Sequence, residues 1–306
     1  MPKHCSLYEE FATQSLAERV EALEAAAGPA GDNDADAIHD VRVASRRIRS
    51  HLRAHKKTFK KKVLEEFQCR VRAVTRGLGT ARELDVTVDL LSQRRKTLKG
   101  PARTAATKVL RALRAERQDE DPNVDASVHL IQDGRFSTSL EKLLSNVKSR
   151  KRCYADAAAA NLNKRLDKVV AKNAMWIESH GDEDLHQVRI AFKRLRYTCE
   201  VFHPLYDEPM TTFLAILKET QQTLGDWNDI RILRDHVERL AKKLDRDARE
   251  GISALHSQLD REVDALRESY ERTSTGFFSE PAIDRVRALF AAVECPCCAS
   301  SPAAKS

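Results

Sequence analysis

The chain has 306 residues, of which 42% are hydrophobic and 32% charged, enough for one large or two medium globular domains. No stretch approaches the roughly 18 apolar residues of a membrane span, and residues 1–20 lack the apolar run of a signal peptide. The net charge of +7 is unevenly placed. Residues 41–115 hold 22 Lys and Arg against 5 Asp and Glu, a net of +17, so the remainder sums to −10. Such segregation attracts anions.

Apolar residues recur with helical spacing along the chain, and no segment alternates like a strand. We therefore expect an all-α fold of antiparallel helices on short loops. The first helices should span about 6–27 and 37–55, with others ending near 76, 99 and 118. The later helices should span about 137–149, 152–179, 184–203, 209–224, 226–245, 247–273 and 281–294.

Breaks between these helices carry turn and cap residues. Residues 28–37 are expected as a linker whose Asp residues cap the next helix. The glycines of GLG at 77–79 suit a C-cap, and Thr80 suits an N-cap. Residues 119–135 look like a polar hinge, and 273–281 (TSTGFFSEP) like a loop. We expect one domain at 6–294, in halves of about 6–130 and 131–294, and a disordered cysteine-containing tail at 295–306.

One cationic pattern occurs twice, in IHDVRVASRRIRSHLRAH (38–55) and LHQVRIAFKRLRYTCEVF (185–202). The spacing matches at an offset of 147, so His39 corresponds to His186 and Arg46 to Lys193. The following segments also match, at an offset of 146, where FQCRVRAVTRGLGTAREL (67–84) corresponds to FLAILKETQQTLGDWNDI (213–230). This recurrence predicts two similar helical units packed side by side.

On a helix each pattern forms a basic stripe, separate from an apolar one. The first stripe contains His39, Arg42, Arg46, Arg49 and Arg53, and the second contains His186, Arg189, Lys193 and Arg196. Tyr197 falls beside His186. A solvated helix face normally interleaves acids with bases, because like charges at i,i+4 repel. Residues 41–64 instead hold ten Lys and Arg and no acid. This favours anion binding over a purely structural role, with acids from neighbouring helices as partial compensation.

These residue types suit phosphate. Arginine grips phosphate oxygens with a planar fork, lysine adds a point charge, and a nearby phosphate favours protonated histidine. A straight row of cations suits an extended polyanion better than one small phosphate, and no glycine-rich phosphate loop is present. The sequence therefore predicts a surface for a long phosphate chain.

The doubled H-x-x-R-x-x-x-[KR]-R-x-R pattern, with LGTARELDV and LGDWNDIRIL following, resembles the CHAD domain (conserved histidine α-helical domain) over about residues 6–293. This resemblance implies two antiparallel four-helix bundles with pseudo-twofold symmetry, and basic surfaces that bind inorganic polyphosphate. The matched positions are His39, Arg42, Arg46, Arg47, Arg49, His186, Arg189, Lys193, Arg194, Arg196 and Tyr197. Arg53 extends the first stripe. Arg72 and Lys218 are expected as flanking contacts.

The sequence departs from the family pattern at Glu83, where the family usually has Asp. It also lacks the E-x-E-x-K motif of the CYTH domain that often accompanies CHAD domains. The resemblance thus implies a stand-alone binder of polyphosphate without catalytic residues, metal ligands or cofactor. The expected location is cytoplasmic, with association to polyphosphate granules left open.

Non-specific DNA or RNA binding is the alternative, since nucleic acids are also phosphate chains. Against it, the stripes carry almost no aromatic residues to stack on bases, and no nucleic-acid-binding motif is present. An enzyme is less favoured, because the cations at i+3 and i+7 from each histidine (Arg and Arg after His39, Arg and Lys after His186) would repel a metal cation. No membrane contact is expected, and protein partners stay open.

Overall fold

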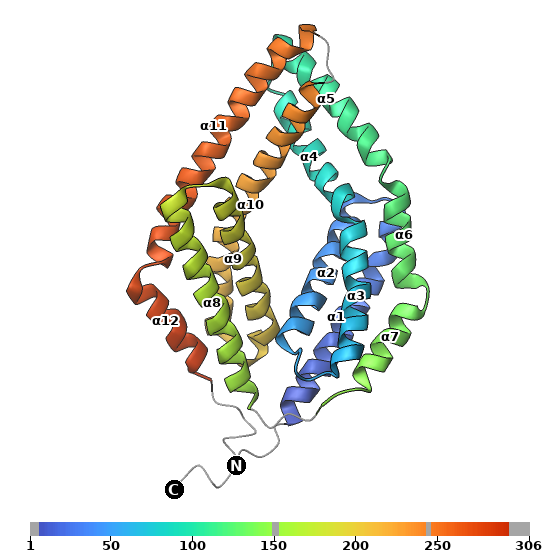
Figure 1. The fold of residues 1–306 in the computed structure, drawn as a ribbon, viewed down its shortest axis with the longest axis vertical. Helices are drawn as coiled ribbons and strands as arrows, with labels where there is room; N and C mark the ends of the chain where they lie inside the picture. The colour runs from blue at the N-terminus through green and yellow to red at the C-terminus, as the bar shows by residue number, and fades with distance from the viewer. Residues whose placement is uncertain (1–5, 149–152, 243–245, 294–306) are drawn as a thin grey trace.

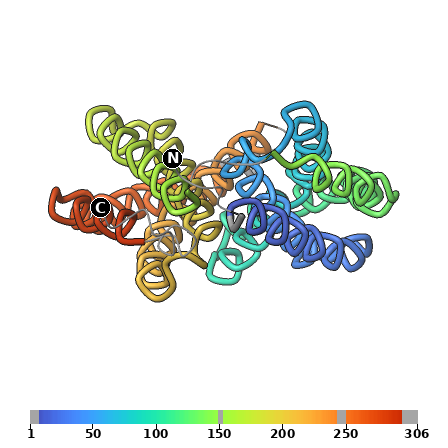
Figure 2. The backbone as a smooth tube through the Cα atoms, turned by 90° about the horizontal axis from the view of Figure 1, so that it is seen from below, coloured from blue at the N-terminus to red at the C-terminus, as the bar shows by residue number. Residues whose placement is uncertain are grey.

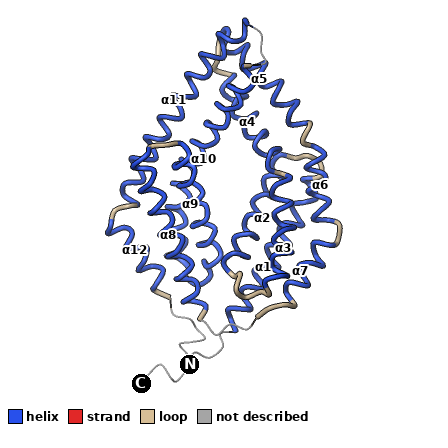
Figure 3. Tube along the Cα trace, in the orientation of Figure 1, coloured by secondary structure: helices blue, strands red, loops and turns tan. Residues whose placement is uncertain are grey.

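The computed structural model describes residues 6–148, 153–242 and 246–293. These residues form α-helices and one short 3-10 helix, and no strand occurs among them (Figure 3). The predicted all-α fold class is confirmed. In chain order the helices are α1 (Ser6–Ala30), α2 (Ala35–Ala54), α3 (Lys61–Gly77), α4 (Gly79–Arg95), α5 (Gly100–Gln118), α6 (Asp121–Gln132), α7 (Arg135–Leu144), α8 (Tyr154–Ser179), α9 (Asp182–Phe202), η1 (His203–Leu205), α10 (Asp207–Ala241), α11 (Arg246–Phe277) and α12 (Glu280–Ala291).

The helices form two groups that lie side by side (Figures 1 and 2). One apolar core joins α1, α2, α3, α6 and α7, while the other joins α8 to α12 with α5 and most of α4. Figure 1 shows α4 and α5 rising to meet α10 and α11 at the upper end. There α5 packs on α11 and α4 on α10, and α2 packs on α9 lower down. As a result, α2, α4, α9 and α10 surround the centre of the molecule.

The first helix of each group buries the same face. In α1 the buried positions begin at Tyr8 and end at Ala30, and in α8 they begin at Tyr154 and end at Trp176. Each position recurs at an offset of 146, and the buried residues are Tyr8, Ala12, Leu16, Val20, Leu23, Ala27 and Ala30 in α1 and Tyr154, Ala158, Leu162, Leu166, Val169, Asn173 and Trp176 in α8. The exposed faces of α1 and α8 therefore occupy corresponding places in their two groups.

The segment 119–135 is not the expected polar hinge, because it contains α6. Val124, Val128 and Ile131 lie one helical turn apart and are buried in the first core. Pro122 is tolerated because it lies in the first turn of α6, where a backbone N–H would have no acceptor within the helix. Sequence polarity alone concealed this short amphipathic helix.

Two expected breaks are absent. Residues 207–241 form one continuous helix through Gly225, because buried Leu224 and Trp227 hold both sides of the glycine in the same core. The expected loop at 273–281 is mostly helix, since α11 continues to Phe277. Its hydroxyl side chains bond back to helix carbonyls, as Thr273 does to Ser269 at 2.9 Å, instead of opening the helix.

The junction of α3 and α4 differs in detail from the prediction. Neither glycine of GLG has a positive φ, so neither forms a left-handed C-cap. Gly77 is needed for space, because a Cβ there would lie 2.0 Å from the Ser127 hydroxyl of α6. Thr80 lies inside α4, and Leu78 occupies the N-cap position. By contrast, the Asp cap expected before α2 is confirmed, since the Asp34 carboxylate accepts from the Ala37 N–H at 2.7 Å.

Within the described ranges, the helices are all too short or too polar to cross a membrane. The cysteine-containing tail expected at 295–306 lies outside the described residues.

Candidate functional site

A cleft of about 500 Å³ lies at the centre of the molecule, between α2, α4, α9 and α10. The two histidine patterns meet in it. His39, Arg42 and Arg46 come from α2, and His186, Arg189 and Lys193 come from α9. The remaining walls are formed by Gly79, Arg82, Glu83, Val86 and Thr87 of α4 and by Asn228, Asp229, Arg231 and Ile232 of α10. The cleft thus joins residues about 147 positions apart in the sequence.

Positive charge dominates this cleft. Its lining contains six Arg and Lys residues, two histidines and only two carboxylates, Glu83 and Asp229. Both carboxylates already have partners in the protein. Glu83 lies 3.3 Å from Nε2 of His236, and Asp229 lies 3.9 Å from the Arg189 guanidinium. The cleft therefore keeps an excess of cations that can face an anionic ligand.

On the α2 wall, Arg42 and Arg46 differ in their attachment. The Arg42 guanidinium donates to the backbone oxygen of Thr75 in α3 at 2.9 Å. A Cβ at Gly79 would lie 3.6 Å from the same guanidinium, an ordinary contact distance. Burial, followed by the charges of Arg46 and Arg82, lowers the pKa of Arg42 to about 10. Arg46 makes no ion pair with any described residue, so it is available to a ligand.

On the α9 wall, Lys193 is the most perturbed cation. Burial lowers its pKa to about 7, and the neighbouring charges of Arg189 and Arg46 act in the same direction. Its ammonium group has no hydrogen bond or ion pair among the described residues. The Nε atoms of Arg46, Arg189 and Arg231 are buried and also lack a partner within this described part of the chain. These unpaired donors are suited to an anion that enters the cleft.

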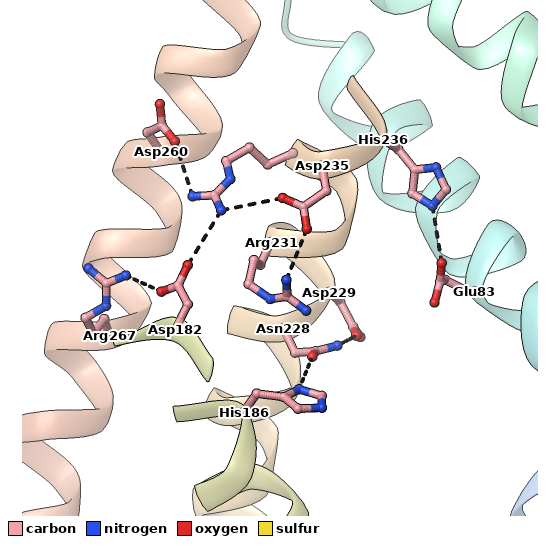
Figure 4. Close-up of polar contacts among 11 residues, drawn as sticks. Glu83, Asp182, His186, Asn228, Asp229, Arg231, Asp235, His236, Asp260 and Arg267 are labelled. Carbon is pink, nitrogen blue, oxygen red and sulfur yellow. Dashed lines mark hydrogen bonds and ion pairs between the residues drawn. The ribbon is translucent and has the colours of Figure 1, made fainter. Parts of the chain in front are cut away.

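His186 has a defined orientation at the edge of α9 (Figure 4). Its Nδ1 lies 3.1 Å from Oδ1 of Asn228, and the Asn228 amide nitrogen donates to Asp229 at 3.2 Å. Burial lowers the pKa of His186, which the Asn228 hydrogen bond opposes and the Arg189 charge reinforces. Burial and the charges of Arg82 and Arg46 also lower the pKa of His39. Both imidazoles are therefore mainly neutral at pH 7 in the free protein.

Ion pairs behind the cleft hold its α9 and α10 walls (Figure 4). Asp182 at the start of α9 accepts from Arg267 of α11 and lies 3.6 Å from Arg234 of α10. Arg234 also reaches Asp260 of α11 at 3.5 Å. Arg231, which lines the cleft, pairs with Asp235 at 3.0 Å. This network ties three helices together and fixes the position of the His186 end of α9.

Three predicted residues continue the basic surface beyond the cleft on one side. Burial, then the charges of Arg72, Arg76 and Arg194, lower the pKa of Arg49. Burial, then Arg165 and Arg194, lower the pKa of Arg53 to about 10. Arg49, Arg53 and Arg72 therefore belong to a second cluster of cations, which connects to the cleft through Arg46.

The other predicted residues lie elsewhere. Arg196 is 3.3 Å from the Glu200 carboxylate, and its guanidinium stacks 5.0 Å from the ring of Tyr197. Tyr197 itself is buried, and Lys218 is exposed on α10. None of these three lines the cleft.

Two cleft cations were missed by the sequence analysis. Arg82 and Arg231 each stand near acids, in TARELD and NDIRILRD, so their segments were interpreted as sources of compensating charge. Their convergence depends on how α4 and α10 pack. The one available signal was that each follows the LG of its repeated segment, Arg82 three residues after Gly79 and Arg231 six residues after Gly225.

Comparison with known proteins gives a consistent result. The model of the CHAD domain family matches residues 14–238. Two curated relatives from Mycobacterium tuberculosis, "Uncharacterized protein MT2285" of strain CDC 1551 and "Uncharacterized protein Rv2226" of strain H37Rv, are each 26% identical over 211 residues, which is 66% of this chain. The match covers 40% of each relative, so the chain spans less than half of their length.

Two solved structures share the fold. The CHAD domain from the plant Ricinus communis superposes with a TM-score of 0.61 and 19% identity, covering 96% of this chain and 95% of that one. PptA from Streptomyces chartreusis superposes with a TM-score of 0.67 and 17% identity, covering 87% and 99%. At these identities the likeness concerns the fold, whereas the family model covers well over half of the sequence. The chain belongs to the CHAD domain family.

Proposed function

We propose that the protein binds linear inorganic polyphosphate in the central cleft. The observation that carries this proposal is the convergence of Arg42, Arg46 and Arg82 from one group of helices with Arg189, Lys193 and Arg231 from the other. Six cations face two carboxylates, of which Glu83 pairs with His236 and Asp229 with Arg189, one of the six. Such a site requires a ligand with several negative charges in a small volume, and a phosphate chain supplies one charge per unit along a narrow backbone.

The arrangement of the cations supports a chain rather than a single phosphate. Cations line opposite walls of an open cleft, from four different helices. A ligand that contacts both α2 and α9 makes its second contact intramolecularly, and this raises the overall affinity. The family resemblance of the sequence supports the same ligand.

Nucleic acid is the competing polyanion. Single-stranded DNA and RNA are usually held by aromatic side chains that stack on bases. The residues of the cleft include no Phe, Tyr or Trp in the described part of the chain. The proposal therefore places inorganic polyphosphate ahead of nucleic acid, with the phosphate backbone as their shared feature.

We propose binding without catalysis. In the cleft, the His186 imidazole is oriented by an amide oxygen rather than by a carboxylate, so it lacks the partner that usually makes histidine a stronger base. The protein would then hold, position or target polyphosphate in a cytoplasmic setting, including polyphosphate granules.

Calorimetric titration at near-physiological salt tests the proposal. Long-chain polyphosphate, duplex DNA and structured RNA are titrated in parallel into the same preparation. We expect tight binding of polyphosphate and much weaker binding of both nucleic acids. Equal or tighter binding of DNA or RNA would instead identify a general polyanion surface.

A further inference from the structure

Outside the cleft, a second groove of about 150 Å³ lies between α8 and α9. Its lining contains four cations and no acid among the described residues: Arg165, Lys168 and Lys172 from α8, and Arg194 from α9. The three α8 residues are spaced at i, i+3 and i+7, so they form one stripe along the helix. Lys168 and Arg194 are exposed, and the other two cations are partly exposed. Like charges at this spacing repel in the absence of an anion.

The groove is connected to the cleft by a continuous series of cations. Arg46 lines the cleft, and its charge lowers the pKa of Arg49, which lies about one turn further along α2. The charge of Arg194 lowers the pKa values of both Arg49 and Arg53, and the charge of Arg165 lowers that of Arg53. Arg194 and Arg165 themselves line the groove. A phosphate chain leaving the cleft on this side meets a cation at each step.

The opposite side of the α2–α9 contact allows a comparison of charge with the α8–α9 groove. There, a corresponding groove is lined by Glu18 and Arg19 of α1, Arg47 of α2 and Glu200 of α9, together with Ala22 and Ala44. Two acids balance two bases. Glu200 lies 3.4 Å from Arg47 and 3.3 Å from Arg196. Its carboxylate therefore neutralises the arginines on this side.

Corresponding positions account for the difference. The buried positions of α1 and α8 recur at an offset of 146, so Arg19 corresponds to Arg165 and Ala22 to Lys168. In α2 and α9 the offset is 147, so Arg53 corresponds to Glu200. The two grooves thus occupy similar places in the fold, but only one has accumulated cations.

We propose that the α8–α9 groove is a second phosphate-binding segment, and that a polyphosphate chain leaves the cleft over Arg49, Arg53 and Arg194 rather than past Glu200. This inference rests on the proposed function and adds the path by which the bound chain leaves the cleft. Short chains occupy the cleft alone. Longer chains gain further contacts on α8, so affinity increases with chain length until this groove is filled.

The test compares a groove variant with a matched control. The groove variant is Arg165→Gln/Lys168→Gln/Lys172→Gln. The control, Arg103→Gln/Arg111→Gln/Arg114→Gln, removes three exposed cations from α5 near the upper end of the molecule (Figure 1). Both proteins and the wild type are titrated with tripolyphosphate and with long-chain polyphosphate. Circular dichroism and thermal unfolding establish that each variant is folded.

The groove variant should lose at least about tenfold in affinity for the long chain, because three charge-assisted contacts are removed, each weaker than a contact in the cleft since these cations are wholly or partly exposed. It should retain wild-type affinity for tripolyphosphate, and the α5 control should change little for either ligand. Equal long-chain affinities for groove variant and control would overturn the inference. Failure of the wild type to prefer polyphosphate over nucleic acid would instead overturn the proposed function.

Glu200→Gln supplies an independent measurement. It removes the ion-pair partner of Arg47 and Arg196 and leaves Glu18 as the remaining acid among the described residues of this groove, so the opposite side comes closer to the α8–α9 side in charge. The expected result is tighter binding of long-chain polyphosphate, with tripolyphosphate affinity nearly unchanged. An unchanged or weaker long-chain affinity in a folded Glu200→Gln protein would contradict the assigned direction.

Discussion

His186 and Asn228 determine each other's orientation at the edge of the cleft. The Asn228 amide nitrogen donates to Asp229 at 3.2 Å, so its oxygen must face Nδ1 of His186, 3.1 Å away. Nδ1 therefore carries the proton, and Nε2 of the neutral ring is an acceptor. A phosphate oxygen cannot donate to an acceptor. Phosphate binding at this side of His186 thus requires a second proton on the ring.

Polyphosphate binding should consume protons at the histidines. The pKa values of His39 and His186 are lowered in the free protein, and a bound polyanion favours their charged forms. Because both pKa values lie below the ordinary 6.5, more than half of each ring is neutral at pH 6.5 before binding and can take up a proton on binding. Calorimetry in buffers of different ionisation enthalpy should show proton uptake, which should fall clearly in His39→Gln/His186→Gln. Equal uptake by this variant and the wild type would remove both histidines from binding.

Lys193 should set the pH dependence at higher pH. Its pKa is about 7 in the free protein, so below that pH the ammonium is already charged and above it binding must first add a proton. Affinity should therefore be highest below pH 7 and fall as pH rises, by up to about tenfold per unit for one proton. Titrations at a series of pH values measure this.

Lys193→Arg is the matched control for that experiment. Arginine keeps the charge throughout the range, so the decline above pH 7 should become shallower by the one proton that Lys193 takes up, while the histidine-linked part persists. A decline of wild-type steepness in Lys193→Arg would assign it to another group.

Salt should weaken binding through the unpaired cations of the cleft. By analogy with nucleic acids, each neutralised phosphate releases counterions, so the logarithm of affinity falls linearly with the logarithm of salt concentration. Arg46→Gln/Lys193→Gln should reduce this slope by about two, one for each lost contact. Titrations of both proteins over a salt series give the slopes. Parallel lines for variant and wild type would place these two residues outside the binding surface.

The upper junction of the fold should depend on Gly251 of α11. A Cβ at this position would lie 2.1 Å from the Pro101 carbonyl oxygen and 2.4 Å from its carbon, so α5 or α11 would have to move. Gly251→Ala should lower the free energy of unfolding by about 1–3 kcal/mol, despite the higher helix propensity of alanine. Urea unfolding measures the change.

Gly276 in the same helix is the matched control, because a Cβ there meets nothing within 4 Å. Gly276→Ala should be stabilising by up to about 1 kcal/mol. Similar effects of the two substitutions would contradict the close contact of α5 with α11.

The helical fold and the two stripes followed from local patterns. Apolar spacing of 3.6 residues is a property of each helix alone, so α2 and α9 could be located before their partners were known. Helix ends were less predictable. Gly225 suggested a break in α10, but tertiary packing of Trp227 outweighed the cost of one glycine, about 1 kcal/mol.

The composition of the cleft was only partly accessible from sequence. Arg196 lies at the edge of the α9 stripe and does not line the cleft. Glu200, one helical turn later, forms an ion pair with it. Arg82 and Arg231 enter from helices that show no stripe. Which cations converge depends on the packing of α4 and α10, and local periodicity does not contain that information.

The most direct test of the account is the affinity of Arg46→Gln/Lys193→Gln for long-chain polyphosphate. Both side chains line the cleft without an ion pair to any described residue, so their loss should leave the fold intact. Arg103→Gln/Arg111→Gln, at two exposed positions of α5, also removes two cations and serves as the control. Calorimetry should show at least about a hundredfold weaker binding by the cleft variant, since two charge-assisted contacts are lost, and little change in the control. Equal affinities for a folded cleft variant and the control would contradict polyphosphate binding in the central cleft.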